Sequence, residues 1–160
     1  MILSGLHQQI EIAKNAAKEA GKVLLHKKDS LNQSIFSSDK DIKLKADIEA
    51  ENIIKSILEK ESSFPILAEE SGKSKEHLDE TFWVVDPLDG TANYARDIPL
   101  CCVSIALMHK MNPVLGVIYD FNDNTKVTFV IEGKKDRGSG EEARQLFGYM
   151  ACYDCTNGIF

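Results

Sequence analysis

A short acidic sequence follows an apolar stretch near the middle of the chain. Asp86 and Asp89 stand three residues apart, and Pro87 and Gly90 fix the backbone between and after them. Both carboxylates can therefore converge, together with a peptide carbonyl, on one hard cation, for which Mg²⁺ is better suited than Zn²⁺. If a helix begins at Thr91, its backbone N–H groups would face an anion held by that cation. The pattern predicts a turn that holds a cation against a phosphate.

Two further acidic segments precede this turn. Residues 64–72 begin as a short apolar run and include Glu69 and Glu70, the pattern of a strand that delivers carboxylates at its C-terminal edge. Asp47 lies where a helix is expected to open, and it can reach the Thr91 hydroxyl and orient it as a water-activating relay. A single aspartate is more often a structural residue that caps a helix or solvates a turn. Three separated acidic segments, however, predict one shared site.

These segments together resemble the inositol monophosphatase family, whose members are Mg²⁺-dependent and Li⁺-sensitive phosphatases. The hallmark of that family is an Asp-Pro-Leu/Ile-Asp-Gly-Thr loop preceded by a strand that ends in Glu-Glu, and residues 86–91 match the loop. The sequence around the loop agrees as well, at Trp83-Val84-Val85, Asn93-Tyr94, Pro99 and residues 103–107. The resemblance spans most of residues 5 to 132.

The resemblance implies a set of metal ligands. Of the paired acids, Glu69 rather than Glu70 would bind metal and also position the attacking water. Asp86 would bridge two metal ions, Leu88 would contribute its backbone carbonyl, and Asp89 would bind the second metal. The family implies two or three Mg²⁺ ions, with Li⁺ as a possible inhibitor.

The resemblance also implies a phosphate-binding element and a relay. Gly90 and Thr91 would hold the phosphate through backbone N–H groups, and Thr91 with Asp47 would polarise the water. The sequence contains no Ser-His-Asp arrangement, P-loop or Gly-x-Gly-x-x-Gly motif. Direct attack by a metal-activated water, without a covalent phosphoenzyme, is therefore the expected chemistry.

We expect a phosphomonoesterase that hydrolyses inositol monophosphate or a related small sugar phosphate. The sequence Thr91-Ala-Asn93-Tyr94 is similar to the inositol-phosphate and fructose-bisphosphate branches of the family, which carry Thr-x-Asn-Phe/Tyr. A fructose-1,6-bisphosphatase or bisphosphate-nucleotidase relative stays an alternative, as does a truncated and catalytically silent fragment of such a phosphatase. The expected partner is a small phosphorylated polyol or sugar, and a homodimer is possible because the family generally forms one.

The end of the sequence departs from the family pattern. Family members are longer and carry a Trp-Asp segment that completes the second metal site, whereas the only tryptophan here is Trp83. Residues 133–160 are rich in glycine and lack the alternating pattern that precedes them. The expected division is an inositol-monophosphatase-like N-terminal domain at 1–132 and an atypical tail at 133–160 that is not family sequence.

Composition agrees with one soluble globular domain. The chain has 160 residues, of which 43% are hydrophobic and 28% are charged, enough to bury a core. A formal net charge of -6 argues against a nucleic-acid partner, because a polyanion is bound by a basic surface. No apolar run is long enough to span a membrane, and no signal peptide is recognisable, so we expect a cytoplasmic protein.

The four cysteines do not predict a disulfide framework. Cys101 and Cys102 are adjacent and are expected to pack as small apolar residues at the start of a strand. Cys152 and Cys155 form one Cys-x-x-Cys pair without a second pair or nearby histidines, which is weak evidence for zinc.

Hydrophobic periodicity predicts the elements that position the acidic segments. Apolar residues recur every three or four positions from Leu6 to Leu24, which predicts a helix, and residues 29–38 are expected to form a loop. A second helix is expected from about Ile42 or Ala46 to Lys60, packed beside the first. The apolar face of this second helix comprises Ala50, Ile53, Ile54, Ile57 and Leu58.

The period then changes to that of strands. Five strands are expected, at residues 65–68, 81–85, 102–108, 113–119 and 126–131. Turn residues between the last three strands predict an antiparallel meander. The predicted fold class is α+β, with two helices packed on a largely antiparallel sheet, resembling the N-terminal half of the layered α/β sugar-phosphatase fold.

Overall fold

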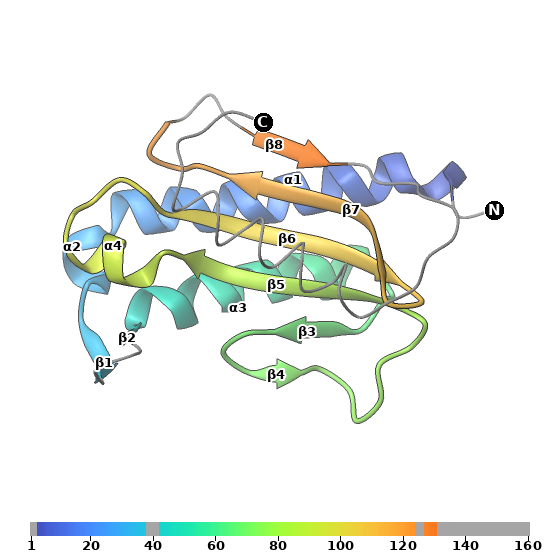
Figure 1. Ribbon diagram of the computed structural model, residues 1–160, viewed down its shortest axis with the longest axis horizontal. Helices are drawn as coiled ribbons and strands as arrows, with labels where there is room; N and C mark the ends of the chain where they lie inside the picture. Colours follow the sequence, from blue (N-terminus) through green and yellow to red (C-terminus); the bar gives the residue numbers. More distant parts are fainter. Residues whose placement is uncertain (1–2, 38–41, 124–126, 131–160) are drawn as a thin grey trace.

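Two long helices cover one face of a mixed β-sheet. The computed structural model of the chain describes residues 3–37, 42–123 and 127–130. Helices α1 (Leu3–His26) and α3 (Lys45–Glu61) lie side by side behind the sheet, with α1 against β6 and β7 and α3 against β5 (Figure 1). The predicted α+β fold, two helices on a largely antiparallel sheet, is confirmed.

The main sheet has six described strands in the order β4-β3-β5-β6-β7-β8. Their bounds are β3 (Ile66–Ala68), β4 (Gly72–Lys73), β5 (Thr81–Asp89), β6 (Cys102–His109), β7 (Asn112–Tyr119) and β8 (Val127–Val130). Strands β3 and β5 run parallel, and every other neighbouring pair is antiparallel. The five predicted strands and the antiparallel meander are present, while β4, only two residues long, was not predicted.

The stripe of apolar residues on α1 is buried against the sheet. Its members are Leu6, Ile10, Ala13, Ala17, Ala20 and Leu24, each at most 8% exposed. The small side chains let the helix approach the strands closely. At Gly21 there is no room for a side chain, because a Cβ there would lie 2.5 Å from the Tyr119 ring.

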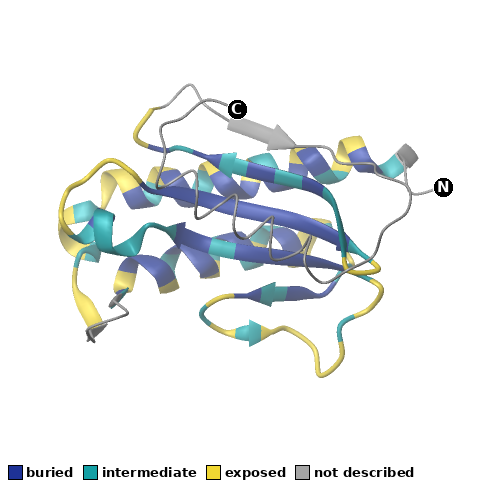
Figure 2. Ribbon diagram, viewed as in Figure 1, coloured by how far each residue is buried: buried dark blue, intermediate teal, exposed yellow. Residues whose placement is uncertain are grey.

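The central strands β5 and β6 are apolar and buried on both faces (Figure 2). On the helix side, Trp83 is fully buried, and its indole N–H donates to Ser62 Oγ at 3.0 Å. On the opposite side a second buried cluster comprises Phe82, Val84, Ala106 and Met108. This burial on both faces explains why the sequence of β5 reads as a continuous apolar run before its aspartates.

The loop predicted at residues 29–38 is wrong where the structure describes it. Helix α2 (Lys28–Leu31) and strand β1 (Ser34–Ser37) occupy this stretch, and β1 pairs antiparallel with β2 (Ile42–Leu44). Such short strands exist because they pair with each other, which a local polar sequence does not reveal.

The second helix begins at Lys45, so the prediction of a start at Ile42 is wrong and the alternative at Ala46 is close. The reason is local: Asp47 Oδ2 accepts a hydrogen bond of 2.8 Å from the Leu44 backbone N–H, which closes the first turn of α3. Ala50, Ile54 and Leu58 on its predicted apolar face are buried.

The expected tail at 133–160, with Cys152 and Cys155, lies outside the described residues, so the division after residue 132 stays a prediction. Among the helices that the structure describes, none combines the length and apolarity that crossing a bilayer requires. Cys101 and Cys102 are buried at the start of β6 and form no disulfide with another described residue, as expected for small apolar residues.

Candidate functional site

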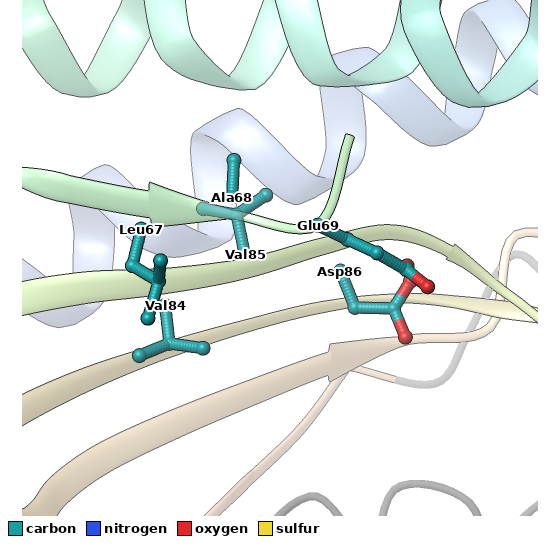
Figure 3. Close-up of a pocket in the computed structure, with 6 residues that line it drawn as sticks. All are labelled: Leu67, Ala68, Glu69, Val84, Val85 and Asp86. Carbon is teal, nitrogen blue, oxygen red and sulfur yellow. The ribbon is translucent and has the colours of Figure 1, made fainter. Parts of the chain in front are cut away.

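The parallel pair β3 and β5 brings two acidic residues to one edge of the sheet. Ala68 is paired with Val85, and the Glu69 N–H donates to the Val85 carbonyl at 3.0 Å, so the next residues on the two strands, Glu69 and Asp86, are neighbours. Figure 3 shows their side chains pointing toward each other with the carboxyl groups side by side. Glu69 and Asp86, which are separated in the sequence by β4 and the residues on either side of it, therefore meet, as the sequence predicted.

Asp86 and Asp89 lie within β5 rather than in a turn after it, so that part of the prediction is wrong. The strand continues to Asp89, and its register with β6 shifts between the two aspartates. The irregularity is stabilised locally because Asp86 Oδ1 accepts a hydrogen bond of 3.2 Å from the Leu88 N–H. The turn itself comes at Gly90, whose φ of 87° is a conformation that favours glycine.

The electrostatics of Asp86 indicate a crowded set of negative charges. The pKa of Asp86 is raised from 3.8 to about 9, first by burial and then by the charges of Glu69 and Asp89 and a hydrogen bond with Glu69, against the lowering effect of the Leu88 N–H. Three acidic side chains thus lie close enough for their negative charges to repel one another. A cation placed among them would relieve that repulsion.

The donor set at this edge fits a hard cation in its chemistry. Carboxylate oxygens from Glu69, Asp86 and Asp89 and the carbonyl of Leu88 are the ligand types that Mg²⁺ binds. In the described part of the chain, however, no group of three or more His, Cys, Asp or Glu side chains is arranged as a ready coordination set.

Thr91 and Asp47 form the second part of the site. The Thr91 hydroxyl lies 2.7 Å from Asp47 Oδ1 and 3.0 Å from the Leu88 carbonyl, and it can donate to either. Asp47 is 2% exposed, and burial raises its pKa to about 6, while hydrogen bonds from Thr91 and the Leu44 N–H act in the opposite direction. The contact expected from the sequence is present, and the relay role stays a prediction.

A short helix, α4 (Thr91–Ala95), follows Gly90 at the expected position. The backbone N–H groups of Asn93 and Tyr94 both donate to the Gly90 carbonyl at 2.9 Å, which anchors its first turn. Phosphate binding by Gly90 and Thr91 stays a prediction.

Glu70 points to a different partner from Glu69. Its carboxylate forms an ion pair with Lys43 of β2, and the Glu70 side chain is 13% exposed. The hydrogen bond with Glu70 raises the pKa of Lys43. Glu70 therefore links strand β2 to the acidic edge.

Sequence reasoning missed Glu51. This residue is 3% exposed, and its carboxylate accepts hydrogen bonds from the backbone N–H groups of Glu70 at 2.8 Å and Ser71 at 3.1 Å. The available signal was its position four residues after Asp47, on the same side of α3 as Ala50 and Ile54, where an acid is unexpected.

A cavity of 230 Å³ lies beside the acidic edge (Figure 3). It is lined by Leu67, Ala68, Glu69, Val84, Val85 and Asp86. The carboxyl groups of Glu69 and Asp86 stand at one side of an otherwise apolar lining.

Comparison with known proteins agrees with the motif. The sequence profile of the inositol monophosphatase family matches residues 6–145. Inositol monophosphatase 1 of Sus scrofa is 30% identical over 142 residues, which cover 86% of this chain and 50% of the pig protein. The Nus factor SuhB of Xylella fastidiosa is 40% identical over 116 residues, which cover 69% of this chain and 41% of that protein.

Solved structures agree with the fold. The crystal structure of the extragenic suppressor protein SuhB from Bartonella henselae has a TM-score of 0.70 and 34% identity, over 79% of this chain and 50% of that one. The chain thus spans about half or less of the length of these relatives. Some of them are named as Nus factors, so the expectation of no nucleic-acid partner stays a prediction.

Proposed function

Because the chain belongs to the inositol monophosphatase family, we propose that it carries the cation-binding edge of a Mg²⁺-dependent phosphomonoesterase. The observation that supports this most is the meeting of Glu69 and Asp86 at the ends of two parallel strands, with Asp89 close enough to raise the Asp86 pKa. The proposed substrate is inositol monophosphate or a related small phosphorylated polyol or sugar.

Glu69, Asp86, Asp89 and the Leu88 carbonyl would hold Mg²⁺ in this proposal. When bound there, Mg²⁺ supplies the positive charge that acidifies a water and neutralises the phosphate. The relation to the family makes Li⁺ an expected inhibitor. It also favours a cytoplasmic enzyme that forms a homodimer.

Thr91 and Asp47 would handle the proton of the attacking water. With its own proton directed to Asp47 Oδ1 at 2.7 Å, the Thr91 hydroxyl oxygen is free to accept a hydrogen bond from that water. Asp47 has a pKa of about 6, so it is mostly ionised at neutral pH and can hold this orientation. Glu69, on the exposed side of the edge, would orient the water from the other direction.

A phosphatase assay with Mg²⁺ on inositol 1-phosphate and fructose 1,6-bisphosphate tests the proposal. Asp86→Asn is expected to reduce turnover by more than the roughly 10- to 100-fold that loss of an outer-shell partner costs a metal site. Asp79→Asn is the matched control, because Asp79 is exposed on the connection between β4 and β5. Equal and negligible turnover in the wild-type chain and Asp86→Asn would instead favour a catalytically silent fragment.

A further inference from the structure

Glu51 is a buried carboxylate that the proposed chemistry does not use. It lies on the sheet-facing side of α3, is 3% exposed, and has the apolar side chains of Ala50 and Ile54 on the same helix face. Burying a carboxylate among apolar groups is costly unless strong hydrogen bonds compensate. The compensation here is the pair of backbone N–H groups from Glu70 and Ser71.

Those two N–H groups belong to the turn that carries Glu69. The turn joins β3 to β4, with Ala68 paired to Gly72, and Gly72 has a φ of 72° that suits a glycine at the end of a tight hairpin. Within this turn the Glu69 N–H donates to the Val85 carbonyl of β5. Three consecutive amides are thus fixed, the first by the neighbouring strand and the next two by Glu51.

The same helix also fixes the other part of the site. Asp47 precedes Glu51 by four residues, so both carboxylates lie on one side of α3. Asp47 holds the Thr91 hydroxyl, and Glu51 holds the backbone directly after Glu69. Because a helix is rigid over one turn, the distance between the Thr91 region and the Glu69 region is set by the spacing of two side chains on α3.

We infer that Glu51 is a positioning residue for the proposed cation edge, which holds the β3–β4 turn so that the Glu69 carboxylate faces Asp86. This inference rests on the proposed function. The two carboxylate oxygens of Glu51 accept from the backbone N–H groups of Glu70 and Ser71, the residues directly after Glu69. Its effect on the cation is therefore exerted through the turn.

Titration of the chain with Mg²⁺ alone tests the inference without a substrate. Glu51→Gln keeps the shape of the side chain but replaces one acceptor oxygen with an N–H₂ group that faces a backbone donor. The expected result is Mg²⁺ affinity about tenfold weaker by calorimetry, the low end of what outer-shell changes cost. In the enzyme assay the Mg²⁺ concentration at half-maximal rate should rise similarly, while the KM for substrate at saturating Mg²⁺ changes little.

Glu49→Gln is the matched control. Glu49 lies on the same helix, but its side chain is 44% exposed and approaches Lys27 at 3.8 Å rather than the turn. Its replacement is expected to leave Mg²⁺ affinity unchanged. Hydrogen exchange gives a second readout, because the Glu70 and Ser71 amides should lose protection in Glu51→Gln and keep it in Glu49→Gln.

Unchanged Mg²⁺ affinity in Glu51→Gln would overturn the inference and leave the proposed function standing. If Glu51→Gln does not fold, Glu51→Asp provides the same test, because it keeps the charge and withdraws the carboxylate from the turn by one methylene. Absence of Mg²⁺ binding by the wild-type chain would overturn the proposed function, and the inference with it.

Discussion

The two parts of the proposed site differ in how the protein compensates for acidic side chains. At the β3–β5 edge, Glu69 and Asp86 face each other, and their repulsion adds to the effect of burial on the Asp86 pKa. At the contact between α3 and α4, both oxygens of Asp47 accept hydrogen bonds, from Thr91 and from the Leu44 N–H. The fold alone completes the second part, whereas in the proposed function a bound cation would complete the first part.

The largest expected consequence of this difference is the pH dependence of stability without metal. The pKa of Asp86 is raised from 3.8 to about 9, so between these values the folded chain keeps a proton that the unfolded chain has lost. Stability therefore falls as pH rises through this window, by at most about 1.4 kcal/mol per pH unit for one proton. Chemical denaturation at several pH values with a chelator present measures it.

Asp86→Asn sharpens this prediction because it removes the titrating group and keeps the side-chain size. The variant should show a flatter pH profile above about pH 7, where Asp47, with a pKa of about 6, is already mostly ionised. Addition of Mg²⁺ should stabilise the wild-type chain more than the variant. A profile that is equally steep in both proteins would contradict the assignment of the charge repulsion to the β3–β5 edge.

Thr91→Val tests the part that the fold completes. The variant keeps the side-chain shape but leaves Asp47 Oδ1 without the hydroxyl donor at 2.7 Å. A buried acceptor that loses its partner costs about 1–3 kcal/mol, so the urea midpoint should fall accordingly with or without Mg²⁺. Thr91→Ser, which keeps the hydroxyl, should retain most of the stability. A loss in Thr91→Val that appears only when Mg²⁺ is present would show that the contact depends on the cation.

The sequence was sufficient to predict the convergence of the acidic segments, because each one follows or precedes an element with a clear hydrophobic period. The ends of β3 and β5 and the start of α3 are of this kind. It was not sufficient for strands β1 and β2, since three or four residues carry too little pattern to predict a strand without the pairing partner.

Glu51 escaped prediction for another physical reason. Its partners are the backbone N–H groups of Glu70 and Ser71. Every residue type except proline has this donor, so the sequence does not show which residues bind Glu51. The extension of β5 to Asp89 was missed because the register shift with β6 lets the strand continue past Pro87, a residue that ordinarily interrupts one.

The smallest expected effect concerns Lys55, which contacts the same turn as Glu51 from the solvent side. Its Nζ lies 2.8 Å from Ser71 Oγ in an exposed hydrogen bond, so water can replace it. Lys55→Ala should change the free energy of unfolding by no more than about 0.5 kcal/mol and leave Mg²⁺ affinity close to that of the wild-type chain. Urea denaturation and Mg²⁺ calorimetry measure both. If Lys55→Ala weakened Mg²⁺ binding as much as Glu51→Gln, an exposed hydrogen bond would position the turn as strongly as the buried Glu51 carboxylate does. The two backbone hydrogen bonds of Glu51 would then not distinguish it from a surface contact.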